Sequence, residues 1–205
     1  MMKIDAVLPR FLSDFTVAIA VITGAAAPSL AAAVDETAAE FTRSGANEVF
    51  AEMRSAASLD EKEAYFRRLL RQDFDMDGIS RFVLGPYWRT ASREQQQEFR
   101  GLLEKHITLS HGRRLAEASG GDFRVTGSRT DPNGVIFVTG EIVASQGERN
   151  AVDFQLGIVA GLYRVQDITI DNVSMMESYR SEIQAVLASH GGQLGALLTA
   201  MREER

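Results

Sequence analysis

The hydrophobic pattern changes its period at Gly120-Gly121, and this change constrains the fold more than any other feature of the chain. Before it, apolar residues recur roughly every three to four positions, as on one face of a helix. After it, apolar and polar residues alternate, as in strands with one buried face. Helices first, strands second and helices last predict an α+β domain with helices packed on one face of the sheet.

Capping boxes predict where the helices begin. A hydroxyl residue followed three positions later by Glu or Gln satisfies two backbone N–H groups at a helix start. This spacing occurs at Thr37–Glu40, Ser58–Glu61, Ser92–Gln95 and Ser174–Glu177. The third box opens the longest predicted helix, with the stripe Phe99, Leu102, Leu103, His106 and Ile107.

Two further segments complete the helical prediction. Residues 79–89, ISRFVLGPYWR, are too apolar for a solvated loop, so we expect a short helix that ends at Gly85 and a turn at Pro86. The C-terminal helix should end at Gly191-Gly192, before a last short helix with Leu194 and Met201.

The strand half predicts an antiparallel meander of about four strands. Turns are expected at Asp131–Gly134, Gln146-Gly147 and Ala160-Gly161. The first strand begins near Phe123, and the second, Val135–Ala144, is apolar on both faces and therefore central. The third strand should bury Val152, Phe154, Leu156 and Ile158. The fourth, Leu162–Val173, changes phase, which indicates a bulge near Gln166-Asp167.

Composition excludes several classes of protein. The chain has 205 residues, a formal net charge of −6, no cysteine and three histidines. The acidic balance argues against a nucleic-acid partner. The lack of cysteine excludes disulfide frameworks, cysteine zinc sites, iron–sulfur clusters and thiol nucleophiles.

The N-terminal segment has the pattern of a secretory signal peptide. Lys3 and Arg10 precede an uncharged run, Phe15–Leu30, and the small residues Ala31–Ala33 follow. We expect cleavage near Ala33 and a single domain over 34–205 that acts outside the cytoplasm. A membrane anchor is the alternative, although the run is shorter than the ~20 residues that span a bilayer.

The apparent catalytic and metal motifs are incomplete. Asp73-x-Asp75-x-Asp77-Gly78 resembles the start of a calcium loop, but Leu84 occupies the twelfth position, where such a loop needs Glu. We interpret these acids as helix-end residues. His106 lies in an apolar stripe and should be buried or at a pocket edge. A small α+β enzyme that uses His106 with an acidic strand residue remains an alternative.

The abundant large hydrophobic residues allow two further interpretations. They fill an ordinary core, as in a purely structural envelope protein, or the helices and sheet stand apart and enclose an apolar ligand pocket.

Two blocks of sequence bear on this choice. Residues 74–99, FDMDGISRFVLGPYWRTASREQQQEF, resemble the MlaC, or toluene-tolerance, family of periplasmic phospholipid-binding proteins. The family has an R-F-V-L-G-x-Y-W-R run followed by a helix start of the form T/S-x-E-Q-x-x-x-F. The second block, residues 162–181, is similar, although Tyr163, Arg164, Asn172 and Met175 depart from the common pattern. Within the family the chain also resembles the hopanoid-associated HpnM branch.

The resemblance implies a lipid carrier rather than an enzyme, with no cofactor, metal or catalytic residue. It implies a phospholipid cargo, an inner-membrane ABC lipid transporter and an outer-membrane lipoprotein complex as partners, and hopanoids as an alternative cargo. Each methylene exposed to water costs about 0.8 kcal/mol, so a lipid with about 30 of them faces a barrier on the order of 24 kcal/mol. An apolar lipid pocket removes this barrier, while the headgroup can stay in water.

The expected pocket residues come from both halves of the domain. The helical candidates and the residues after the sheet are Phe82, Val83, Tyr87, Trp88, Leu103, Ile107, Met176 and Tyr179. The sheet candidates are Val138, Phe154, Leu156, Tyr163 and Val165. A two-residue turn at Gln146-Gly147 would place Phe137 beside Phe154 instead of Val138. We expect Arg81, Arg89 and Arg180 to cap or pair at the surface, and an approach to a lipid phosphate is the alternative for each.

Overall fold

The computed structural model describes residues 36–117, 121–143, 147 and 149–203, with no side chains described over 111–117. The predicted signal peptide, its cleavage site and Gln146 lie outside the described residues. Within residues 36–203 as described, no helix combines the length and hydrophobicity needed to cross a membrane.

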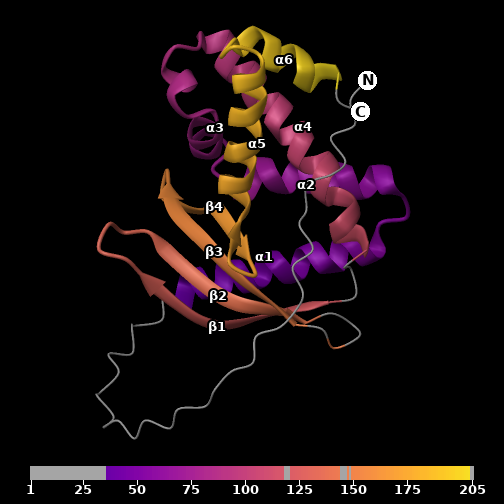
Figure 1. The fold of residues 1–205 in the computed structure, drawn as a ribbon. Coiled ribbons are helices and arrows are strands. Elements are labelled where there is room, and N and C mark those ends of the chain that lie inside the picture. Colours follow the sequence, from indigo (N-terminus) through magenta and orange to yellow (C-terminus); the bar gives the residue numbers. More distant parts are fainter. Residues whose placement is uncertain (1–35, 118–120, 144–146, 148, 204–205) are drawn as a thin grey trace, which may run out of the picture. The chain divides into compact units, whose positions relative to one another are not determined.

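The domain is α+β, as predicted. Its helices are α1 (Glu36–Ser55), α2 (Leu59–Asp73), α3 (Met76–Leu84), the 3₁₀ helix η1 (Gly85–Arg89), α4 (Arg93–Glu117), α5 (Met175–Ser189) and α6 (Leu194–Glu203). Its strands are β1 (Asp122–Thr130), β2 (Ile136–Val143), β3 (Arg149–Val159), β4 (Leu162–Ile170) and β5 (Val173–Ser174). Helix α1 packs along β1 and β2, whereas α2, α3 and α5 contact the sheet through β4 (Figure 1).

Three of the four predicted N-caps form, and the full capping box forms at Ser92. Ser58 Oγ accepts a hydrogen bond from Glu61 N–H at the start of α2, and Ser174 Oγ accepts one from Glu177 N–H at α5. At Ser92 the box is reciprocal, because Gln95 Oε1 also accepts from Ser92 N–H at 2.9 Å. The prediction at Thr37 is wrong: α1 already includes Glu36, and the Thr37 hydroxyl hydrogen-bonds to Tyr163 Oη at 2.6 Å.

Side chains of α5 close the predicted short helix α3. Its C-cap, Gly85, has φ +59, a conformation that glycine adopts readily. Gln184 Nε2 donates to the carbonyls of Val83 and Leu84, and Arg180 Nη1 donates to that of Phe82. The last carbonyls of α3 therefore have partners despite the abrupt end of the helix. Arg180 caps a helix, as expected from the sequence.

The sheet is an antiparallel meander in the order β1-β2-β3-β4-β5, with β2 in the interior as predicted. Val138 lies opposite Phe154, so the register with Val138 beside Phe154 is the correct one. The predicted bulge lies at Gln166, where β4 slips by one residue against β3. An unpredicted register shift occurs between Val125 and Gly127 of β1.

The predicted fourth strand is too long. Asp171 and Asn172 have φ of +48 and +65 and form a tight turn, after which Val173 pairs back onto Ile170. Residues after the turn belong to β5, a short fifth strand. Asn and Asp adopt this left-handed conformation more readily than other residues with a side chain.

Two apolar regions organise the described part of the domain. The helical core is formed by α1–α6 around Met53, Leu84, Phe99, Leu103 and Leu187, each fully buried. The sheet core lies between α1 and the sheet. Its buried members are Ala38, Phe50, Phe123, Ile136, Val138, Val152, Leu156 and Val165.

Candidate functional site

The predicted sheet candidates lie together in the sheet core. Val138, Leu156 and Val165 are buried, and Phe154 and Tyr163 are half-buried beside them. The Phe154 ring meets the edge of Phe123 at a centroid distance of 5.3 Å. This arrangement is an apolar surface on the α1 side of the sheet.

Sequence reasoning missed several members of this surface. Phe41 of α1 lies 5.7 Å from the Tyr163 ring, and Phe74, Val125 and Ile168 pack half-buried around the same core. Phe41, Val49, Phe50 and Met53 form a rough helical stripe in the sequence, but such periodicity does not say against which element Phe41 packs. Ile168 was hidden because the bulge at Gln166 reverses the alternation.

The helical candidates lie in a different place. Val83, Leu103, Ile107, Met176 and Tyr179 are buried members of the helical core. Tyr87 and Trp88 pack half-buried at its edge. The structure therefore divides the expected pocket residues between the two cores.

Phe82 and Ile158 depart from the expected burial. Phe82 is 37% exposed, and the Arg180 guanidinium lies 4.8 Å from its ring centre, so the ring is a surface partner of α5. Ile158 is 64% exposed, because the buried face of β3 ends at Leu156 and the strand continues beyond the sheet core.

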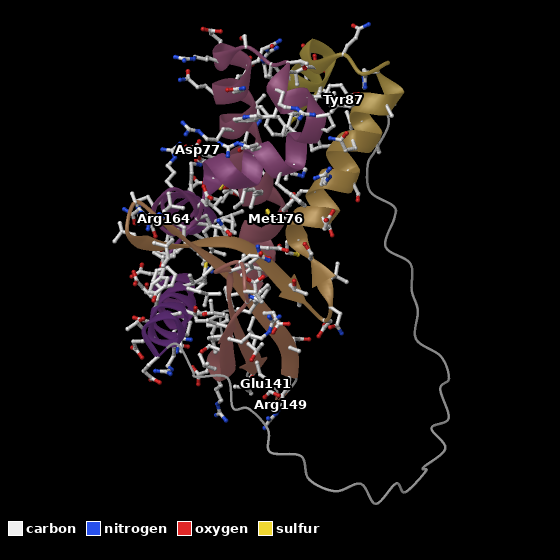
Figure 2. All side chains as sticks on the ribbon, turned by 90° about the vertical axis from the view of Figure 1, so that its left-hand side faces the viewer. Asp77, Tyr87, Glu141, Arg149, Arg164 and Met176 are labelled. Atoms are coloured by element: carbon white, nitrogen blue, oxygen red, sulfur yellow. The ribbon has the colours of Figure 1, made fainter. Side chains whose placement is uncertain are left out.

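A hollow of about 410 Å³ lies where β3 and β4 approach α2, α3 and α4. Phe74, Met76 and Val159 supply its apolar wall, and Arg71, Arg100 and Arg164 are among its charged residues. Figure 2 shows Arg164 and Asp77 on the same side of the domain, away from the Glu141–Arg149 ion pair. The hollow is mixed in polarity, unlike the sheet core.

Charge pairs organise this hollow. Arg71 Nε donates to both carboxylate oxygens of Glu104, at 2.8 and 3.0 Å, and this pairing raises the pKa of Arg71. Glu104 is buried, so Arg71 supplies the partner that a buried carboxylate requires. Arg100 Nη1 lies 2.7 Å from Asp77 Oδ1.

The three aspartates of the calcium-like motif have separate structural roles. Asp75 caps α3, where its Oδ1 accepts from Gly78 N–H, and its Oδ2 accepts from Gln166 of the bulge. Asp77 pairs with Arg100, as above. Asp73 ends α2, where burial raises its pKa and Arg164 opposes the rise. They act as helix-end acids, which agrees with the interpretation from the sequence.

Asp167 and Asp75 connect the sheet to the helices. Asp167 Oδ1 accepts from Met176 N–H at 3.1 Å, and its Oδ2 accepts from Ser174 Oγ at 2.5 Å. Asp75 N–H donates to the Val165 carbonyl, next to a parallel bridge between Phe74 and Val165. Figure 2 shows Met176 where α5 leaves the sheet. These contacts fix β4 against α3 and α5.

His106 is buried beside Tyr179 and Glu182. Its Nε2 lies 3.5 Å from Glu182 Oε2, and the His106 and Tyr179 rings meet edge to face. Hydrogen bonding to His106 lowers the pKa of Glu182. This carboxylate belongs to α5, whereas the enzyme alternative pairs His106 with an acidic strand residue.

Among the described side chains, no group of three or more His, Asp and Glu residues is arranged to hold a metal ion.

Comparison with known families matches residues 43–203 to the family described as MlaC protein. The chain belongs to the MlaC family. The match covers the whole described domain except the first turns of α1. A comparison with curated proteins gives no match.

A solved structure is similar to this MlaC-family chain. It is described as a phospholipid-binding protein from Ralstonia solanacearum in complex with a phospholipid. The two chains are 20% identical with a TM-score of 0.71, and the alignment covers 81% of this chain and 95% of the other. At this identity the likeness establishes a shared fold.

Proposed function

We propose that this protein is a periplasmic carrier that holds the acyl chains of one phospholipid in the sheet core and leaves the headgroup in water. Membership of the MlaC family supports the carrier class, and the similar fold of a phospholipid-binding protein supports the cargo. The observation that carries the proposal is that several large apolar side chains around the sheet core are only half-buried; we call these side chains its margin.

Half-buried residues make up a larger share of the sheet core than of the helical core, where fully buried residues predominate. Around the sheet core, Phe41, Phe74, Phe154, Tyr163 and Ile168 are only half-buried. Large side chains that are incompletely packed can rotate aside at a lower cost than those of a close-packed interior. In the helical core Tyr87 and Trp88 are half-buried at the edge, but most of the apolar side chains are fully buried, so an inserted chain would displace close packing.

The proposed carrier uses no covalent chemistry. Binding derives from the removal of acyl methylenes from water, at about 0.8 kcal/mol each. We propose that the cargo passes between an outer-membrane lipoprotein complex and an inner-membrane ABC lipid transporter. The signal peptide and cleavage near Ala33 are part of this proposal, and sequencing the N-terminus of the exported protein tests them. An intact Met1 in a membrane fraction would contradict them.

Native mass spectrometry of the exported protein tests the carrier proposal directly. We expect a mass that exceeds the polypeptide by one phospholipid and returns to the bare value after lipid extraction. Fragmentation of the released ligand then identifies a phospholipid or a hopanoid. A bare mass, together with no uptake of a labelled phospholipid by the extracted protein, would refute the carrier function.

A further inference from the structure

The turn between β3 and β4 exposes apolar side chains in water. Ile158 is 64% exposed, Leu162 56% and Val159 40%. Ala160 and Gly161, with φ of +51 and +79, form the two-residue turn between them. No charged residue occurs between Leu156 and Tyr163. We call residues 158–162 the hairpin tip.

The surface next to the hairpin tip is basic, although the whole chain is acidic. Val159 lines the same hollow as Arg71, Arg100 and Arg164. A second hollow of about 340 Å³ continues along α2 and α4 and adds Arg67 and Lys105. The carboxylates lining the two hollows are Asp75, Asp77 and Glu104, and the cations lining them are more numerous. Asp73 adds a carboxylate that interacts with Arg164 from outside this lining. The chain itself has a formal net charge of −6.

We propose that the hairpin tip inserts into the interface of a lipid bilayer containing anionic phospholipids, with Arg164 and Arg100 beside the lipid phosphates. Apolar side chains beside a basic surface are the combination that binds such interfaces. The Arg100–Asp77 pair is exposed on both sides and therefore weak, so Arg100 can exchange its carboxylate for a phosphate.

The shape of the hairpin tip favours a bilayer over a protein partner. A stable protein interface buries about 800 Å² on each side and needs a complementary surface. Three side chains on a convex two-residue turn offer less than this. A fluid bilayer interface accepts a convex apolar tip without a preformed groove. The inference goes beyond the carrier proposal, because it concerns a surface outside the sheet core.

A local fluorescence probe can test this inference without interference from the apolar N-terminal segment. The chain has no cysteine, so Leu162→Cys provides a single site for an environment-sensitive dye. Val173→Cys is the matched control: both residues are 56% exposed, and they lie at opposite ends of the β4–β5 segment. We expect vesicles of phosphatidylglycerol and phosphatidylethanolamine to shift the emission to the blue at position 162 and to leave position 173 unchanged.

Three outcomes would overturn the proposal: no shift at position 162, an equal shift at both positions, or an equal shift with phosphatidylcholine vesicles. A monomeric short-chain phospholipid can fill a cargo site but provides no surface. An emission shift of the same size with this monomer would therefore also overturn it.

Substitution supplies a second test. Ile158→Thr with Leu162→Thr places a polar, strand-compatible residue at both hairpin positions, and Ile170→Thr with Val173→Thr is the control pair. We expect about tenfold weaker vesicle binding for the first pair and unchanged binding for the second. Equal binding by both pairs would overturn the proposal. Native mass spectrometry of each variant separates the two functions. A hairpin variant that keeps its lipid cargo but binds vesicles less would show that the hairpin tip serves membrane binding and not cargo binding.

Discussion

Replacing Phe154 by tryptophan tests whether the sheet core receives acyl chains. Phe154 is half-buried and lies opposite Val138 of β2 and Ile168 of β4. The centre of its ring lies 5.3 Å from the centre of the Phe123 ring. An indole is larger than a phenyl ring. In a site filled by protein side chains, the additional volume overpacks the core and costs about 1–3 kcal/mol.

The structure provides a matched control at Phe99. This side chain is 0% exposed in the helical core, so Phe99→Trp must overpack its surroundings. For a domain of this size, about 1 kcal/mol lowers the melting temperature by about 2–4 °C. We therefore expect Phe99→Trp to melt about 2–12 °C lower than the wild type while retaining normal lipid uptake.

If the sheet core holds acyl chains, we expect Phe154→Trp to keep its stability and to lose lipid uptake, the opposite of Phe99→Trp. The indole occupies space otherwise taken by lipid, so the extracted protein should melt within about 2 °C of the wild type and take up less labelled phospholipid. Lipid must be removed from all variants first, because a bound ligand raises the apparent stability. A clearly destabilised Phe154→Trp variant with normal uptake would refute the assignment of the acyl chains to this face of β3.

Other predictions concern the framework and its pH dependence. Ser92→Ala removes the reciprocal capping box of α4 and should cost about 0.5–2 kcal/mol in urea unfolding without changing the bound lipid; altered lipid at unchanged stability would contradict this role. Gly140→Ala places a Cβ 2.4 Å from the Phe123 ring, so we expect a loss above about 1 kcal/mol, and wild-type stability would show that β1 can shift aside. His106 lowers the pKa of Glu182. The interaction therefore stabilises the fold at any pH above the ordinary glutamate pKa of about 4.3, and this stabilisation is lost as the pH falls through the lowered pKa of Glu182. The stability difference between wild type and Glu182→Gln should thus narrow on acidification, and a constant difference would argue against the pair.

Local chemistry explains what the sequence predicts correctly. The caps at Ser58, Ser92 and Ser174 need only neighbouring backbone N–H groups, so the three-residue spacing is sufficient evidence. The same holds for the turn at Ala160-Gly161 and the bulge at Gln166, which depend on backbone conformation and on the alternation of side chains.

The incorrect predictions concern side chains whose environment is set by contacts with distant parts of the chain. The Thr37 hydroxyl meets Tyr163 across the domain instead of capping α1. Phe82 looks like a core residue in its own helix, but Arg180 of α5 packs on its ring at the surface. Neither contact leaves a trace in local periodicity, which predicts burial without naming the partner.

The same limit affects the candidate site. Hydrophobic periodicity predicts Leu103 and Leu156 equally well, because both are fully buried. One belongs to the helical core and the other to the sheet core, and this assignment depends on how α1 and the helices beyond β4 pack around the sheet. Hydrophobic periodicity therefore does not predict whether the helical candidates and the sheet candidates line one pocket or two separate cores.

One hairpin connects the two proposed lipid contacts. Leu156 is fully buried in the sheet core, whereas Ile158, two positions further along β3, is 64% exposed at the hairpin tip. At about 3.3 Å per residue, these positions are about 7 Å apart along the strand. No charged side chain interrupts the chain between Leu156 and Tyr163. If the sheet core holds acyl chains and the hairpin tip enters a bilayer, a methylene that leaves the membrane has to pass only this short apolar stretch of β3 to reach the sheet core. The barrier against crossing water, which grows with every exposed methylene, then applies to a few carbons at a time rather than to the whole lipid.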